Sequence, residues 1–176
     1  MQSLTPSAGI LVFSEWSGLD DKVIQAVQRA YAHFHPELKP YADWTHVQLG
    51  EGNGSGCEAA AGGVVFIANL QDENNVGNGL KAMAVSETIQ LETGSLGFAD
   101  FCAKRQEKYD WLAFLFAGIT LWVPWLVVTL RHRHMCSGLA AHALEHEGYC
   151  FTRPALLITP MHLAQWAACP HPGRTT

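Results

Sequence analysis

The chain has 176 residues, of which 48% are hydrophobic and 15% are charged, and its formal net charge is −5. This length suffices for one domain with a buried core, so we expect residues 1–176 to form a single domain. An acidic chain with few charges lacks the basic face that nucleic-acid-binding proteins need, so we expect no nucleic acid partner.

The cysteines and the N-terminus indicate the compartment. Five cysteines at irregular spacing, without a CxxC pair, predict neither a disulfide framework nor a zinc ribbon. The first nine residues lack the basic patch and apolar run of a secretory signal. We therefore expect residence in the reducing cytoplasm, while export by a signal-independent route stays open.

The first half of the chain has the hydrophobic patterns of strands and of one amphipathic helix. Residues 20–34 predict a helix that Asp20 caps, with an apolar face made of Val23, Ile24, Val27, Ala30, Tyr31 and Phe34. Short apolar or alternating runs predict strands at residues 10–13, 44–49, 57–61, 63–69 and 84–91. We expect the strands between residues 44 and 69 to form a meander. Its Gly-rich segment 50–56 is a hairpin turn and not a phosphate loop, because no Lys-Ser/Thr follows it.

The second half of the chain is predicted to be mostly helical. Polar residues 71–79 predict a loop, and helices are expected at residues 96–108, 135–147 and 161–168. Gly148 is expected to end the second of these helices. Strands followed by helices predict an α+β domain with an antiparallel meander packed against helices.

The segment 111–130 carries no charge over twenty residues, a length that would just span a bilayer. Gly118 and Pro124 favour a buried hairpin or helix pair instead. A membrane-facing surface flanked by basic residues is one alternative, and a true membrane span is another.

Cys136 is the candidate nucleophile. It lies at the start of the predicted helix 135–147, where the helix dipole and unpaired N–H groups favour a thiolate and could stabilise an oxyanion. The other four cysteines lie in a predicted strand, within a helix, in a loop and near the C-terminus. A buried structural cysteine is the alternative interpretation.

His46 and Glu58 flank the Gly-rich turn. Because the strand after the turn returns beside the strand before it, the Glu58 carboxylate could orient the His46 imidazole as the base of a thiol site. The alternatives are a solvent-facing histidine and a surface glutamate.

Several motifs in chain order resemble those of the circularly permuted NlpC-like papain-fold proteins, including the YiiX-like and lecithin:retinol acyltransferase-like branches. These motifs are Gly9-Ile-Leu-Val-Phe13, Trp44-Thr-His-Val-Gln-Leu-Gly-Glu-Gly52, Glu58-Ala59, Tyr109-Asp-Trp-Leu112, Cys136-Ser-Gly-Leu139 and Thr159-Pro160 with Leu163. The resemblance implies a permuted papain-like fold with the nucleophile at a helix N-terminus. It implies Cys136 as nucleophile, His46 as base and Glu58 as orienter. The sequence departs from the pattern at Gly138, where the family has Glu, at Ile10, which lacks the preceding Asp, and at Gln48 and Leu49.

The resemblance implies acyl chemistry on an amide, ester or thioester. We expect hydrolysis of a peptide or amide first, and lipid acyl hydrolysis or transfer second. A cell-wall peptide would be a substrate only after export. A catalytically inactive binding module on the same fold is the alternative from another class.

A metal site is the remaining alternative. His142 and His146 are four residues apart on a predicted helix, a spacing found in zinc sites. However, no Glu follows the first histidine as in HExxH, so we expect solvated side chains there, with no metal and no cofactor.

Overall fold

A computed structural model of the chain describes residues 9–51, 54–68, 70, 82–85, 93–123, 125–126, 130 and 132–169. The description covers only the backbone at residues 82–85, 93–94, 114, 115, 117 and 156. The predicted loop 71–79 and residues 1–8 lie outside the described residues.

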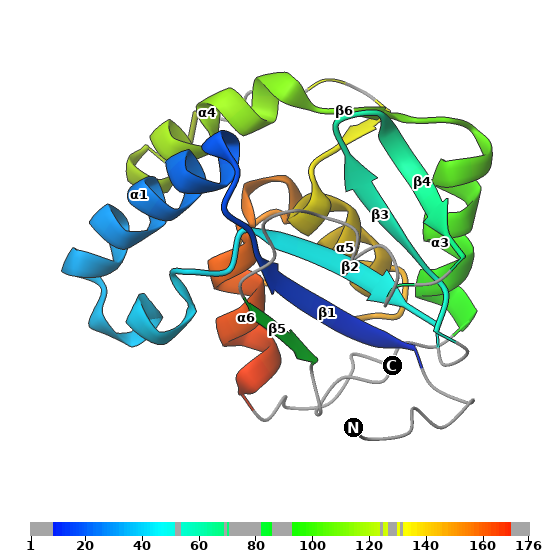
Figure 1. Cartoon of the computed structure of the whole chain (residues 1–176), viewed down its shortest axis with the longest axis horizontal. Helices are drawn as coiled ribbons and strands as arrows, with labels where there is room; N and C mark the ends of the chain where they lie inside the picture. Colours follow the sequence, from blue (N-terminus) through cyan, green and yellow to red (C-terminus); the bar gives the residue numbers. More distant parts are fainter. Residues whose placement is uncertain are drawn as a thin grey trace.

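A five-stranded antiparallel sheet forms one layer of the molecule (Figure 1). The strands are β1 (Ile10–Glu15), β2 (His46–Gly50), β3 (Gly56–Ala60), β4 (Gly63–Ile67) and β5 (Ala82–Val85). They are ordered β4-β3-β2-β1-β5, and each neighbouring pair is antiparallel. The predicted meander is therefore present as β2-β3-β4. The strand predicted at 84–91 corresponds to β5, and residues 86–91 lie outside the described part.

Helices and short strands make up the rest of the fold, which is α+β as predicted (Figure 1). The helices are α1 (Leu19–Phe34), α3 (Thr93–Lys104), α4 (Trp111–Trp122), α5 (Cys136–Glu145) and α6 (Pro160–Ala168), with 3₁₀ helices η1 (Pro36–Tyr41) and η2 (Ala155–Leu157). A small parallel pair joins β6 (Lys108–Tyr109) to β7 (Arg133–His134). Helix α5 packs against β2 and β3, and α3 packs against β3, β4 and α5.

The main core lies between the sheet and helices α3 and α5. Alternate residues of β1 and β2 point into it, among them Leu11, Phe13, Val47 and Leu49, where they meet Leu139 of α5. The small residues of α5, including three alanines that are fully buried, let this helix approach the sheet closely. This packing fixes the position of the α5 N-terminus relative to β2.

The prediction of which α1 residues face the core is wrong in part. Val23 and Phe34 are exposed, whereas Gln25 and Gln28 are buried. The reason is a set of hydrogen bonds: Gln28 Nε2 donates to the backbone carbonyls of Ala42 and Trp44, and its Oε1 accepts from the Met161 N–H. The N-cap of α1 is Gly18 and not Asp20, which lies in the first turn.

Two further boundaries differ from the predictions. Helix α3 ends at Lys104 and not at residue 108, because the chain turns at Gln106, which has φ 53°, and enters β6. Helix α4 continues through Gly118 instead of breaking there, and Gly118 lies against the Val27 side chain of α1.

The segment 111–130 is also less buried than predicted. The side chains of Trp111, Ile119, Trp122 and Trp125 are exposed on the surface. Within the described residues, no helix combines the length and the apolar character that crossing a bilayer requires. Residues 124 and 127–129 lie outside the described part.

Candidate active site

The structure brings His46 and Glu58 into direct contact. The register Leu49↔Cys57 and Gly50↔Gly56 of β2 with β3, extended by one residue, sets Gln48 opposite Glu58 and His46 diagonal to it. Glu58 Oε2 lies 2.7 Å from His46 Nε2 and accepts a hydrogen bond from Gln48 Nε2 at 2.8 Å. One carboxylate oxygen therefore binds two side chains of the neighbouring strand.

The electrostatics of this contact favour a charged imidazole beside a charged carboxylate. Burial opposes a charge on His46. The negative charge of Cys136 and hydrogen bonds with Cys136 and Glu58 outweigh it and raise the pKa of His46 to about 10. Burial also opposes the Glu58 charge, but hydrogen bonds from His46 and Gln48 hold the pKa of Glu58 below its ordinary value. The His46 imidazolium and the Glu58 carboxylate thus stabilise each other's charged forms.

Cys136 is the first residue of α5, after the N-cap Met135. The first intrahelical hydrogen bond of α5 runs from the Leu139 N–H to the Met135 carbonyl, so the N–H groups of Cys136 to Gly138 have no partner within the helix. Ser137 Oγ donates a 2.6 Å hydrogen bond to the Ile158 carbonyl and ties this first turn to the chain before α6. An anion beside the Cys136 sulfur would therefore lie at the positive end of a fixed helix.

Two cavities meet at Cys136. The first has a volume of about 130 Å³ and is mainly apolar, lined by Val23, Ile24, Val27 and Leu121 among others. The second has a volume of about 270 Å³ and is lined by polar groups that include His46, Glu58, Asp20 and Asp21. Cys136, Thr45 and Tyr109 line both cavities. A molecule bound across the junction would pass over the Cys136 sulfur.

Two residues of this site were not predicted from the sequence. Tyr109 lines both cavities, and burial together with the negative charge of Cys136 raises its pKa, so its phenol stays protonated. Its position directly before the α4 N-cap Asp110 was the available signal. Gln48, noted only as a departure from the family pattern, holds Glu58 from the neighbouring strand. At Gly138, the other marked departure, the contact that an added Cβ would make with the described residues is with the Ala155 carbonyl oxygen, at 3.8 Å.

The other thiols lie in different surroundings. Cys57 and Cys102 are buried, and burial raises the pKa of their thiols to about 11 and about 12. Cys150 and Cys169 are exposed and line neither of the two cavities. Among the described cysteines, Cys136 therefore combines an electrostatic interaction with His46 and a position at the junction of both cavities.

The histidine pair of α5 does not converge on one point. His142 Nδ1 pairs with Glu145 at 3.1 Å, and the His146 ring stacks on Phe98 with centroids 4.4 Å apart. Within the described residues, a group of three such side chains whose possible metal-ligand atoms all lie within 4.8 Å of one another is formed by Cys102, Glu107 and His134.

Searches against protein-family models, curated proteins and solved structures found no match to this chain.

Proposed function

We propose that the protein is a cysteine-dependent acyl hydrolase of the amidase or peptidase type, built on a circularly permuted papain-like fold. Cys136 is the nucleophile, His46 the base and Glu58 the residue that orients His46. The observation that carries this proposal is that Cys136, at a helix N-terminus where two cavities meet, lines the same cavity as His46, whose imidazole lies 2.7 Å from the Glu58 carboxylate. The permuted order agrees with β2 carrying the base ahead of α5 in the chain.

The proposed reaction has two halves. The Cys136 thiolate attacks the substrate carbonyl, and the oxyanion accepts hydrogen bonds from the N–H groups at the start of α5. The His46 imidazolium then gives its proton to the leaving nitrogen as the C–N bond breaks, which leaves a thioester on Cys136. Water attacks the thioester while His46 takes its proton, and the carboxylic acid leaves as the thiolate forms again. Glu58 stabilises the imidazolium in both halves.

The lining of the cavities supports an orientation for the substrate. The apolar cavity suits the side chain or acyl chain of the carbonyl half. Asp20 and Asp21 beside the polar cavity suit a cationic amine in the leaving half. We infer that the preferred substrate is an amide that joins a short apolar acyl group to a basic amine, such as an acylated lysine or a basic peptide.

A lipid acyl substrate is the second candidate, and the surface near the apolar cavity favours it. Helices α1 and α4 lie side by side (Figure 1) and form two walls of that cavity. Large apolar side chains on or just after these helices are exposed: Leu19, Val23, Phe34, Ile119, Trp122, Trp125 and Leu126. Trp and Leu side chains of this kind enter the boundary between lipid headgroups and acyl chains.

The first test is the trapping of an acyl group on Cys136. The protein is incubated with an N-hexanoyl lysine amide, quenched in acid and mapped by mass spectrometry, in parallel with Cys136→Ala and His46→Ala. We expect a hexanoyl thioester on Cys136, and release of free amine that falls at least about a hundredfold in both variants. Exposed Cys150 serves as the control thiol within the same molecule.

Alkylation by iodoacetamide near neutral pH separates a nucleophile from an inert thiol. We expect Cys136 to react faster than Cys150 in the parent and slower in His46→Ala. If Cys136 reacts no faster than Cys150 and no substrate acylates it, a binding module is the better description. If phosphatidylcholine vesicles acylate Cys136 and the amide does not, the lipid candidate replaces the amidase.

A further inference from the structure

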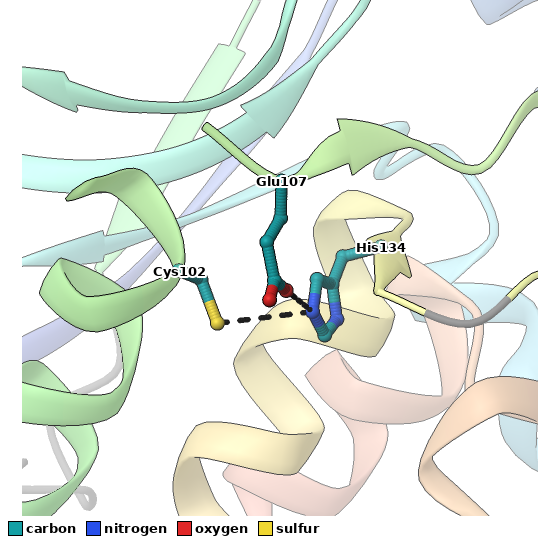
Figure 2. Close-up of side chains that lie close together, drawn as sticks. All are labelled: Cys102, Glu107 and His134. Carbon is teal, nitrogen blue, oxygen red and sulfur yellow. Dashed lines mark hydrogen bonds and ion pairs between the residues drawn. The ribbon is translucent and has the colours of Figure 1, made fainter. Parts of the chain in front are cut away.

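Figure 2 shows a second cluster of chemically reactive side chains, and none of its members lines either of the two cavities. Cys102 comes from the end of α3, Glu107 from the turn before β6, and His134 from β7. Glu107 Oε2 lies 2.8 Å and Cys102 Sγ 3.8 Å from the same atom, His134 Nε2. The three side chains are 1%, 7% and 8% exposed, in chain order. Three segments that are distant in sequence thus direct one donor atom each at a single buried point.

The cluster is not a second nucleophilic relay. In a thiol–histidine–carboxylate relay the two ring nitrogens have separate partners, one for the thiol and one for the carboxylate. Here both contacts fall on Nε2, and within the described part of the chain His134 Nδ1 has no hydrogen-bond partner. Burial also keeps the Cys102 thiol protonated, with its pKa raised to about 12.

The three donor atoms are arranged as the ligands of a small divalent cation. Zinc binds sulfur at ~2.3 Å and nitrogen or carboxylate oxygen at ~2.0–2.2 Å, so tetrahedral geometry sets its donors about 3.3–3.6 Å apart. All three atoms already lie within 4.8 Å of one another, and the sulfur–nitrogen separation is 3.8 Å. The 2.8 Å contact of Glu107 with His134 would have to open by about half an ångström, and the sulfur–nitrogen separation of 3.8 Å would have to close by a few tenths. We propose that Cys102, Glu107 and His134 bind a zinc ion, with water at the fourth position.

The charges of the cluster fit a divalent cation. Burial lowers the pKa of His134, so its ring is neutral and able to coordinate. Hydrogen bonds from His134 and Cys102 overcome burial and lower the pKa of Glu107, so a carboxylate is held in the interior. Its outer oxygen Oε1 faces Arg105 at 3.7 Å and His132 at 3.5 Å, and both of these side chains are well exposed. Zinc would displace the thiol proton of Cys102 to solvent, and its two positive charges would balance one thiolate and one carboxylate.

The position of the cluster gives the ion a structural role. His134 pairs with Tyr109 in the β6–β7 ladder and lies two residues before Cys136. A zinc ion would therefore tie α3 and the turn before β6 to the segment that leads into α5. This site differs from the His142/His146 pair considered in the sequence, and it does not depend on the proposed hydrolase activity.

Metal binding by the full chain tests the proposal. The protein, without a histidine tag, is stripped with a chelator under reducing conditions and titrated with Zn²⁺ or Co²⁺. We expect one metal per chain, a thiolate-to-cobalt charge-transfer band and a higher melting temperature with Zn²⁺. Cys102→Ser should lose the band, and Glu107→Gln should bind Zn²⁺ at least about tenfold more weakly. Cys136→Ala and His142→Ala are the matched controls and should keep metal and band.

Three results would overturn the zinc site. The first is substoichiometric metal in the parent after reconstitution. The second is unchanged affinity in Cys102→Ser or Glu107→Gln variants whose circular dichroism matches the parent. The third is loss of the band in Cys136→Ala, which would place the metal at the candidate active site. Cys136→Ala leaves Cys102, Glu107 and His134 intact. Its cobalt spectrum therefore tests whether the metal binds at the candidate active site, even where Cys102→Ser fails to fold.

Discussion

The contact between Glu58 and His46 allows one electrostatic prediction to be worked out in full. Glu58→Gln replaces the carboxylate oxygen 2.7 Å from Nε2 with a neutral amide of the same size. Because the two side chains are only 17% and 9% exposed, solvent screens their interaction weakly. An opposite charge this close shifts a pKa by about 1–3 units, and each unit corresponds to ~1.4 kcal/mol. Protonated His46 should therefore lose about 1.4–4 kcal/mol of stabilisation.

The expected result is a lower pKa of His46. Glu58 raises that pKa, which is about 10 in the parent, so its removal lowers it by about 1–3 units. Cys136 contributes more than Glu58 to the raised value, so Cys136→Ala should lower it further than Glu58→Gln does. The assay is an NMR titration of histidine-labelled protein over about pH 5 to 11. The resonance of His46 is identified by its loss in His46→Asn.

A matched control and a refuting result complete this experiment. Glu145→Gln removes a different carboxylate, which lies 3.1 Å from His142 on a more exposed surface, and should leave the pKa of His46 unchanged. If Glu58→Gln changes the pKa of His46 by less than about half a unit, the carboxylate does not stabilise the imidazolium. Glu58 would then have no orienting role by charge.

Three other predictions concern stability and the apolar cavity. Because folding lowers the pKa of Glu58, its carboxylate stabilises the folded protein at a pH above the ordinary pKa of glutamate, and this stability is lost as the pH falls. In urea unfolding, the parent should therefore lose more stability between about pH 5 and 3 than Glu58→Gln does, and equal losses would contradict this. Gln28→Leu leaves three backbone groups without their hydrogen-bond partner. The free energy of unfolding, measured in urea, should fall by about 3 kcal/mol once the gain in apolar burial is included. The control Gln165→Leu, at a half-buried position, should lower it by less than about 1 kcal/mol. Gly118→Ala places a methyl group 3.2 Å from Val27, beside the apolar cavity. This variant should lower kcat/KM for a hexanoyl amide more than for an acetyl amide. Equal effects on the two substrates would show that the acyl chain lies elsewhere.

The local patterns of the sequence were sufficient for most elements of the sheet. Alternation in β2 and the apolar run of β1 predicted strands, because one face of each meets the core. The Gly-rich turn predicted the antiparallel return of β3, and thus the proximity of His46 and Glu58. The position of Cys136 at a helix start followed from the periodicity of α5. These features depend on neighbours in the chain, so sequence reasoning reaches them.

Burial of α1 and α4 could not be read from their sequences. Gln28 is buried because backbone groups of Ala42 and Trp44, between η1 and β2, and of Met161 in α6 need partners, and those groups meet only in the folded chain. Val23, Ile24 and Val27 of α1 line the apolar cavity, whereas Leu19 and Phe34 are exposed. Gly118 has no side chain, which allows the Val27 side chain to pack closely against α4. Hydrophobic periodicity predicts which residues share one face of a helix, and tertiary contacts decide whether that face is buried.

The sequence by itself determined an α+β domain, its meander and the candidates Cys136, His46 and Glu58, because these follow from periodicity, turns and motif order. Only the tertiary structure decided that Cys136 lies at the junction of an apolar and an acidic cavity, and that Tyr109 and Gln48 belong to the same site. It also brought Cys102, Glu107 and His134 to one point. Such sets are assembled by helix and strand packing between distant segments, and no spacing along the chain encodes that packing.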